Sequence, residues 1–231
     1  MINISFEILK SNLNCCDSSK TGCGTSGCKR SEGRIPRGLY FEERAKDSPC
    51  TVVVGMNPSP ADEKECDHIK NKANQFEVWE KWFSKSNGVL QSYSYYVNTR
   101  SFLNALGCKG DILWTECHYC EEDRFDIDVA RVCMNQHLNQ QLSWAKQKFG
   151  DNYLVLALGE VTYELLRMHP EFTSLIPKLI GIYHPSGRQA WRLEEMFIPF
   201  EDRQFSEKTG LFVQSKKDEG PFFIKTKNIS G

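Results

Sequence analysis

Short runs of apolar residues mark the predicted strands of this chain. Two of them, at 51–55 and 153–158, are apolar at nearly every position, and shorter runs lie at 112–115 and 179–182. Strands buried on both faces of a parallel sheet are typically apolar throughout, whereas half-exposed strands alternate. We therefore predict buried strands at these four places, and a further strand at 93–97.

Between these runs the apolar residues recur at helical spacing. We predict a long helix over 130–149 and a helix that carries Leu165 and Leu166. An aromatic stripe over 76–83 has the same spacing, and we interpret it as the core-facing side of a further helix. Strands that alternate with helices favour an α/β fold, in which helices cover both faces of a mostly parallel sheet.

A helix start follows the first strand. Ser59 can cap that helix, Pro60 suits its first position, and Asp62 completes a Ser-x-x-Asp capping box. The tetrad Gly-Met-Asn-Pro at 55–58 is then the turn between strand and helix. It places Asn57 at the carboxyl end of a strand, which is the edge where open α/β sheets bind their ligands.

The chain has 231 residues, of which 40% are hydrophobic, so it can bury a full core as one domain over 1–231. Its N-terminal segment, 1–48, is rich in Ser, Gly, Cys and charge. Such a composition is poor material for a self-supporting core, and we expect a bound metal to hold it in place. Residues 201–231 form a polar tail.

Charge and hydropathy limit the partners. The 29 basic residues are balanced by 30 acidic ones, so any contact with nucleic acid has to come from local patches. No apolar stretch approaches the roughly 20 residues of a membrane helix, and the first residues do not resemble a signal peptide. We expect a cytoplasmic protein with no membrane partner and no obligate protein partner.

Ten cysteines are many for a chain in a reducing compartment. In such a compartment, so many cysteines indicate a metal or cluster site more strongly than they indicate disulfides. Most of them fall into two groups, one near the N-terminus and one near the middle of the chain: Cys15, Cys16, Cys23 and Cys28, then Cys117, Cys120 and Cys133.

Two motifs resemble the active-site loops of the uracil-DNA glycosylase superfamily. Gly-Met-Asn-Pro at 55–58 is similar to the first motif of the single-strand-selective and mismatch-specific branches, and His-Pro-Ser at 184–186 is similar to the second motif of nearly all branches. Their order, and their placement after predicted strands, strengthen the resemblance. It implies a three-layer α/β/α domain around a central, mostly parallel four-stranded sheet.

Enzymes of this superfamily flip a nucleotide out of DNA and cleave its glycosidic bond. The resemblance implies that His184 donates to O2 of the departing pyrimidine and that Asn57 orients the attacking water. Neither motif contains a lysine that could form a Schiff base, so we expect a monofunctional, hydrolytic enzyme. Other residues of the two loops are expected to contact the base or the DNA: Gly55, Met56, Pro58, Ser59, Ser186 and Arg188. An ordinary solvated side chain is the alternative for Arg188.

The cysteines resemble those of the superfamily branch that carries a 4Fe-4S cluster, with Cys23 and Cys28 as the N-terminal pair and Cys133 as a third ligand. For the fourth ligand two alignments remain open, one through Cys117 and one through Cys120. We adopt Cys120, because it aligns the run at 112–115 with the strand of the family. A structural zinc site is the alternative, with Cys23 and Cys28 as one pair of ligands and Cys117 and Cys120 as the other.

In the Cys120 alignment, Glu116 stands where this branch has an asparagine that binds the uracil edge. A carboxylate accepts hydrogen bonds, so it suits the N4 amino group of cytosine and repels O4 of uracil. In the Cys117 alignment, Leu113 would replace the asparagine, and a protonated Glu116 would also remove this discrimination.

A glycosylase that removed ordinary cytosine would destroy the genome of its host. The substrate base must therefore differ from ordinary cytosine by a further chemical group. Ser59 stands where the main uracil-specific branch has a ring that excludes a C5 methyl group. We therefore hypothesise a cytosine modified at C5, for example hydroxymethylated or glucosylated as in some phage DNA, and a role in antiviral defence. The alternatives are a uracil or deaminated-base glycosylase in DNA repair, and a non-catalytic, metal-bearing nucleic-acid binding module.

Overall fold

The structure is a computed structural model, and it describes six stretches of the chain: residues 5–14, 39–45, 47–56, 93–119, 126–185 and 226–228. The predicted aromatic helix at 76–83, the capping box after Ser59, and most of the polar tail lie outside these stretches.

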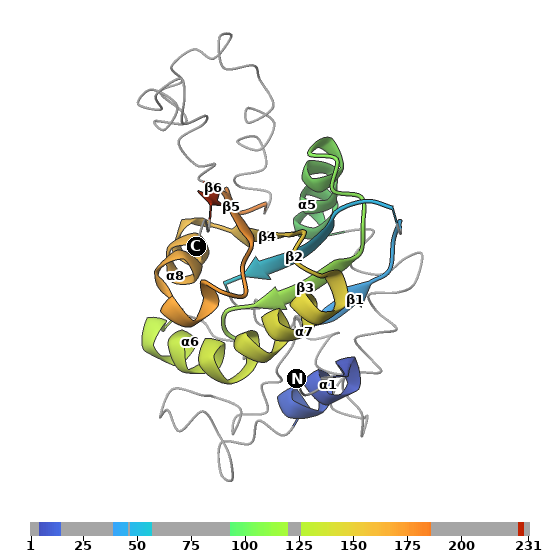
Figure 1. The fold of residues 1–231 in the computed structure, drawn as a ribbon. Helices are drawn as coiled ribbons and strands as arrows, with labels where there is room; N and C mark the ends of the chain where they lie inside the picture. Colours follow the sequence, from blue (N-terminus) through green and yellow to red (C-terminus); the bar gives the residue numbers. More distant parts are fainter. Residues whose placement is uncertain are drawn as a thin grey trace, which may run out of the picture.

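A six-stranded sheet forms the centre of the molecule, with strand order β1-β3-β2-β4-β5-β6 (Figure 1). The four inner strands run parallel, and the two edge strands pair antiparallel to their neighbours. The strands are β1 (Tyr40–Glu42), β2 (Cys50–Gly55), β3 (Ile112–Glu116), β4 (Tyr153–Leu158), β5 (Lys178–Ile182) and β6 (Thr226–Asn228).

The expected α/β fold with a mostly parallel sheet is confirmed, but the expected number of strands is wrong. The four inner strands coincide with the four predicted apolar runs. The two edge strands were not predicted, because each has only three residues and neither Tyr-Phe-Glu nor Thr-Lys-Asn is a continuous apolar run. An edge strand pairs on one side only, so its sequence is less constrained than that of a central strand.

The helical segments are α1 (Phe6–Asn14), α5 (Ser94–Ala105), α6 (Ile127–Cys133), the π-helical η2 (Met134–Leu138), α7 (Asn139–Phe149), α8 (Glu160–Met168) and the 3-10 turn η3 (Pro170–Phe172). The predicted helix over 130–149 is confirmed as the continuous run from α6 to α7. It begins earlier than predicted because Asp126 caps it, its carboxylate accepting from the backbone amides of Asp128 and Val129 at 2.9 and 3.2 Å. The predicted helix at Leu165 and Leu166 is α8.

The prediction of a strand at 93–97 is wrong, because these residues begin helix α5. Tyrosine and valine favour strands locally, but the apolar contacts of the segment have helical spacing. Phe102 and Leu103 are buried against the sheet, and Tyr95 and Tyr96 pack against the same cluster. Tertiary packing therefore overrides the local preference.

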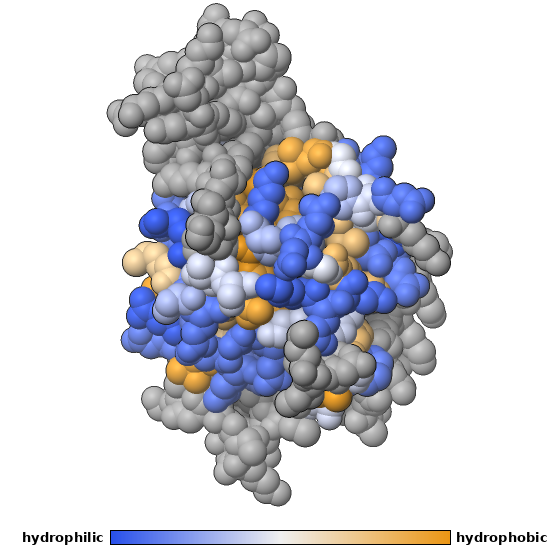
Figure 2. Space-filling view, in the orientation of Figure 1, coloured by the Kyte–Doolittle hydropathy of each residue, from blue (hydrophilic) through white to orange (hydrophobic). Residues whose placement is uncertain are grey.

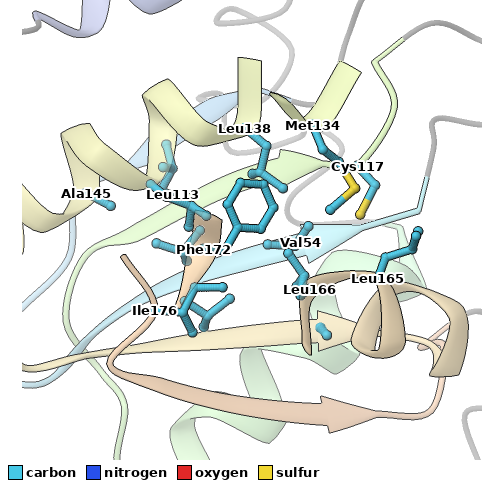
Figure 3. Packing of buried hydrophobic residues seen from close by; sticks show 14 of the residues in the cluster. Val54, Leu113, Cys117, Met134, Leu138, Ala145, Leu165, Leu166, Phe172 and Ile176 are labelled. Carbon is cyan, nitrogen blue, oxygen red and sulfur yellow. The ribbon is translucent and has the colours of Figure 1, made fainter. Parts of the chain in front are cut away.

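Side chains alternate along the inner strands and supply two separate hydrophobic clusters. Val52 and Val54 belong to the cluster that also contains residues of α1, α6, η2, α7 and α8, whereas Val53 belongs to the cluster covered by α5. In the larger cluster, Phe172 is fully buried among residues that include Val54 and Leu138 (Figure 3). Helices therefore cover both faces of the sheet.

The described parts of the N-terminal segment pack against this core through aromatic rings. The Phe6 ring of α1 lies 5.3 Å from the Trp144 ring of α7, and the Phe41 ring of β1 lies 5.3 Å from the same tryptophan. Leu9 and Leu39 are also buried. Apolar contacts thus contribute to holding this segment, whatever its cysteines bind.

Hydrophilic side chains cover most of the described part of the face seen in Figure 2, and hydrophobic surface gathers around α5. Within the described stretches, none of the helices combines the length and the apolar character that a membrane span requires.

Candidate functional site

The candidate site lies where β2, β3 and β5 end, at the carboxyl edge of the parallel sheet. Gly55 and Glu116 are the last residues of β2 and β3, and they are register partners. The pairing continues past the strands, because the amide of Cys117 donates to the carbonyl of Gly55 at 2.9 Å and the amide of His118 donates to that of Met56 at 3.1 Å. The backbone that carries Glu116 is therefore fixed by hydrogen bonds on both sides of this residue.

Strand alternation directs the site residues to one face of the sheet. Val53 and Trp114 belong to the cluster under α5, so Gly55 and Glu116, two residues further along each strand, lie on that same face. Ile180 and Ile182 of β5 belong to the same cluster, and His184, which follows β5, contacts the ring of Tyr95 in α5. Three separate chain segments thus meet beneath the N-terminal end of α5.

Gly55 provides the space in which Glu116 and Tyr95 lie. A Cβ atom at Gly55 would be 2.7 Å from Cδ of Glu116 and 2.5 Å from the Tyr95 hydroxyl, and it would collide with Oε2 of Glu116. Real Cβ contacts are essentially never this short. The carboxyl group and the hydroxyl therefore converge on one point above the glycine, and Glu116 is only 7% exposed there.

Tyr95 is a site residue that the sequence did not indicate. It lies in the first turn of α5, its side chain is partly buried, and its hydroxyl lies beside Glu116. Burial raises the pKa of Tyr95 well above its ordinary value, and the negative charge of Glu116 adds to the shift. The phenol is therefore protonated over the whole physiological range and can donate a hydrogen bond. No sequence motif indicates Tyr95. The local sequence at 93–97 favours a strand, and only the structure shows that these residues begin helix α5.

His184 also contacts Tyr95, with the two ring centroids 5.4 Å apart. Burial lowers the pKa of His184, so its imidazole is neutral at neutral pH. The loop that carries it is held by α5, because the side-chain amide of Asn98 donates to the carbonyl of Pro185 at 3.0 Å. A neutral imidazole in a fixed loop offers one N–H donor without a charge.

A buried polar network supports β3 from the opposite face of the sheet. Thr115, which precedes Glu116, is hydrogen-bonded to both Tyr119 and Gln141, and the Tyr119 hydroxyl donates to Oε1 of Gln141 at 2.5 Å. All three side chains are at most 2% exposed. The network joins the end of β3 and its following loop to α7, and so stabilises the position from which Glu116 projects.

Two cysteines of the predicted metal region are described, and they are neighbours. Cys117 and Cys133 are both buried free thiols, and Cys117 lies beside Met134 (Figure 3). The pKa of Cys117 is raised well above its ordinary value by burial, then by Glu116 and by Cys133. Among the described residues, no group of three or more histidines, cysteines or carboxylates is arranged to hold a metal ion.

The structure brings together three of the predicted residues, Gly55, Glu116 and His184, and Tyr95 joins them. Met56 follows Gly55 and is half-buried, with its carbonyl bonded to the amide of His118. The other predicted site residues lie outside the described stretches: Asn57, Pro58, Ser59, Ser186, Arg188, Cys23, Cys28 and Cys120.

No protein-family model and no curated protein matches this sequence. The chemistry of the site is therefore argued from its side chains alone. It combines one buried carboxyl group with a neutral phenol and a neutral imidazole, all fixed by the sheet and α5. In a largely buried position such groups form stronger hydrogen bonds than they do in water, and they suit the polar edge of a flat ligand.

We predict that Gly55→Ala destabilises the folded protein by about 1–3 kcal/mol, because the new methyl group overlaps the Glu116 carboxyl and the Tyr95 hydroxyl. The free energy of unfolding in urea measures this. The same change made in a Glu116→Ala background should be less destabilising, since one of the two obstacles is gone. Equal destabilisation in both backgrounds would contradict the proposed crowding.

We also predict that His184 titrates below the ordinary histidine pKa of about 6.5. Because the folded state then binds fewer protons than the unfolded state, acidification below that value should destabilise the protein. Histidine NMR resonances measure the titration, and His184→Gln assigns the signal by removing it. This variant should also lose less stability between neutral pH and mild acid than the wild type. A His184 pKa at or above the ordinary value would refute the prediction.

Proposed function

We propose that this chain is a monofunctional DNA glycosylase that hydrolyses the N-glycosidic bond of a flipped pyrimidine, a cytosine modified at C5. One observation carries the proposal. The buried Glu116 carboxyl group lies above Gly55 at the end of β3 beside the Tyr95 hydroxyl, and the His184 ring lies 5.4 Å from the Tyr95 ring. A hydrogen-bond acceptor and a donor are thus both neighbours of Tyr95, and recognition of a flipped pyrimidine requires groups of both kinds.

The arrangement of the two motifs supports a glycosylase of the uracil-DNA glycosylase type. The first motif begins at the end of β2 and the second follows β5, and both strands end at the same edge of the sheet. Helices on both faces of that sheet agree with the three-layer architecture that the resemblance implies. The proposal thus rests on placement as well as on short sequence motifs.

The end of β3 supports the alignment in which Glu116 replaces the base-binding asparagine. Strand β3 runs to Glu116, whose side chain lies on the α5 face beside Gly55. Leu113, the candidate in the other alignment, is buried in the cluster on the opposite face. Glu116 is therefore in the better position to contact a base held beside Tyr95 and His184.

In the proposed mechanism the base leaves as an anion while positive charge develops on the sugar. His184, a neutral donor, stabilises the negative charge that grows on O2 of the base. Glu116 accepts a hydrogen bond from the N4 amino group and so selects cytosine. Asn57 orients the water that attacks C1′ of the sugar as the C1′–N1 bond breaks. The proton that this water loses goes to the base anion, and the products are the free base and an abasic site.

The direct test uses DNA oligonucleotides that carry uracil, cytosine, 5-hydroxymethylcytosine or its glucosylated form. After incubation with the protein, abasic sites are cleaved with alkali and strand scission is measured. We expect scission at a modified cytosine and none at uracil, because the Glu116 carboxylate repels O4. Asn57→Ala should lower the rate by about 100-fold or more, since the water is no longer oriented.

The other outcomes decide between the alternatives. Scission at uracil alone would contradict the role of Glu116 and indicate a repair enzyme. Binding without scission of any of the four substrates would indicate a nucleic-acid binding module. Scission at a modified cytosine would instead support a function against foreign DNA that carries such bases.

We further propose that the cysteines hold a 4Fe-4S cluster with a structural role. Cys133, the described member of the predicted ligand set, is a buried thiol, and buried thiols suit a thiolate-bound metal centre. Cys23, Cys28 and Cys120 would complete the set. The cluster would join the N-terminal segment to α6 and takes no part in the proposed hydrolysis.

Metal analysis and the visible absorbance of protein purified without oxygen test this centre. We expect about four irons per chain and a broad absorbance that reductant bleaches, both lost in Cys133→Ser. The neighbouring thiols serve as matched variants, with Cys120→Ser expected to lose the iron and Cys117→Ser to keep it. The reverse pattern would favour the Cys117 alignment, and one zinc per chain would favour the zinc site.

A further inference from the structure

Tyr95 contacts both groups to which the proposed function assigns base recognition. Its hydroxyl and the Glu116 carboxyl group converge on one point above Gly55, and its ring lies 5.4 Å from that of His184. The three side chains come from α5, from the end of β3 and from the loop after β5. In order of contact they are carboxyl, phenol, imidazole.

The hydrogen-bonding character of these groups follows the same order. A carboxylate accepts, and a neutral imidazole can donate through one N–H. The phenol between them has one proton, which it can give to the carboxylate or, once another donor occupies that carboxylate, to a third group. Burial keeps that proton on the phenol throughout the physiological range. To a ligand that brings a donor to Glu116, the site thus offers acceptor, donor and donor in sequence.

The polar edge of cytosine is the complement of this sequence. Along that edge the N4 amino group donates, the unprotonated N3 accepts and O2 accepts. Uracil presents O4 as an acceptor and N3–H as a donor in the first two positions. Uracil would bring no donor to Glu116, so the carboxylate would face O4 and the phenol proton would stay with the carboxylate. A substituent at C5 leaves the cytosine edge unchanged, so it does not alter this match.

We propose that Tyr95 is a specificity-determining residue that donates its phenolic hydrogen bond to N3 of the flipped cytosine. This inference rests on the proposed glycosylase function and deepens it. It assigns the middle of the base edge to a residue outside both sequence motifs. Glu116 and Tyr95 then act together, because the N4 amino group that donates to Glu116 frees the phenol proton for N3.

The test removes the two partners of this hydrogen bond separately and together. Tyr95→Phe removes the donor, and an oligonucleotide with 3-deaza-5-hydroxymethylcytosine, which has C–H in place of N3, removes the acceptor. Single-turnover scission is measured with both proteins on 5-hydroxymethylcytosine and on its 3-deaza analogue. If the glucosylated base is the better substrate, its own 3-deaza analogue is used.

We expect the wild type to prefer the base with N3 by about 10- to 100-fold, because the analogue leaves a buried hydroxyl without its partner. Tyr95→Phe should lose this preference, with similar rates on both bases. Since both rates come from one protein preparation, any loss of folded protein cancels in their ratio. The expected factor is the same whatever group the base carries at C5.

Tyr96→Phe is the matched control. Tyr96 is the next residue of α5, and its ring packs edge-on against Trp114 with centroids 5.0 Å apart. This variant should keep the wild-type preference for N3. If Tyr95→Phe is slower but keeps that preference, the tyrosine only packs in the site and the inference is wrong, while the proposed function stands. A wild type that cuts none of the bases overturns the proposed function and the inference with it.

Discussion

The parallel pairing of β2 with β3 is the constraint on which the rest of the site depends. Register pairing sets Gly55 beside Glu116, and two further backbone hydrogen bonds extend the pairing beyond the strands. Because Gly55 has no side chain, the Glu116 carboxyl group can lie across the neighbouring strand. A buried polar group is thereby held by the sheet itself, and the site does not depend on a flexible loop for its orientation.

Helix α5 has two functions in this arrangement. Phe102 and Leu103, near its C-terminal end, cover one face of the sheet, and its first turn places Tyr95 over the strand ends. The same helix holds the loop of His184 through Asn98. An ion-pair and hydrogen-bond network around Glu42 of β1, which accepts from Trp114 of β3 at 2.9 Å, also reaches Arg100 of α5. The packing that completes the core therefore also positions the site.

The fold could be predicted from sequence where buried elements have a continuous apolar run or a regular apolar spacing. All four inner strands and the helices α6 to α8 were found from apolar runs and their spacing. The edge strands β1 and β6 were not, because three-residue strands at an edge carry no such signal. Helix α5 was mistaken for a strand because its first residues favour strands locally, and only the packing of Phe102 and Leu103 against the sheet identifies its helical face. The same error concealed Tyr95, whereas Gly55, Glu116 and His184 follow recognisable strands.

Burial shifts the pKa values of the two neutral groups of the site in opposite directions, and both groups are uncharged as a result. It raises the pKa of Tyr95, which keeps the phenol protonated, and it lowers the pKa of His184, which keeps the imidazole uncharged. Both side chains are therefore neutral donors at neutral pH. Recognition at such a site depends on matching donors with acceptors. A ligand edge that offers only an acceptor to the Glu116 carboxylate is disfavoured, and one that offers a donor is favoured.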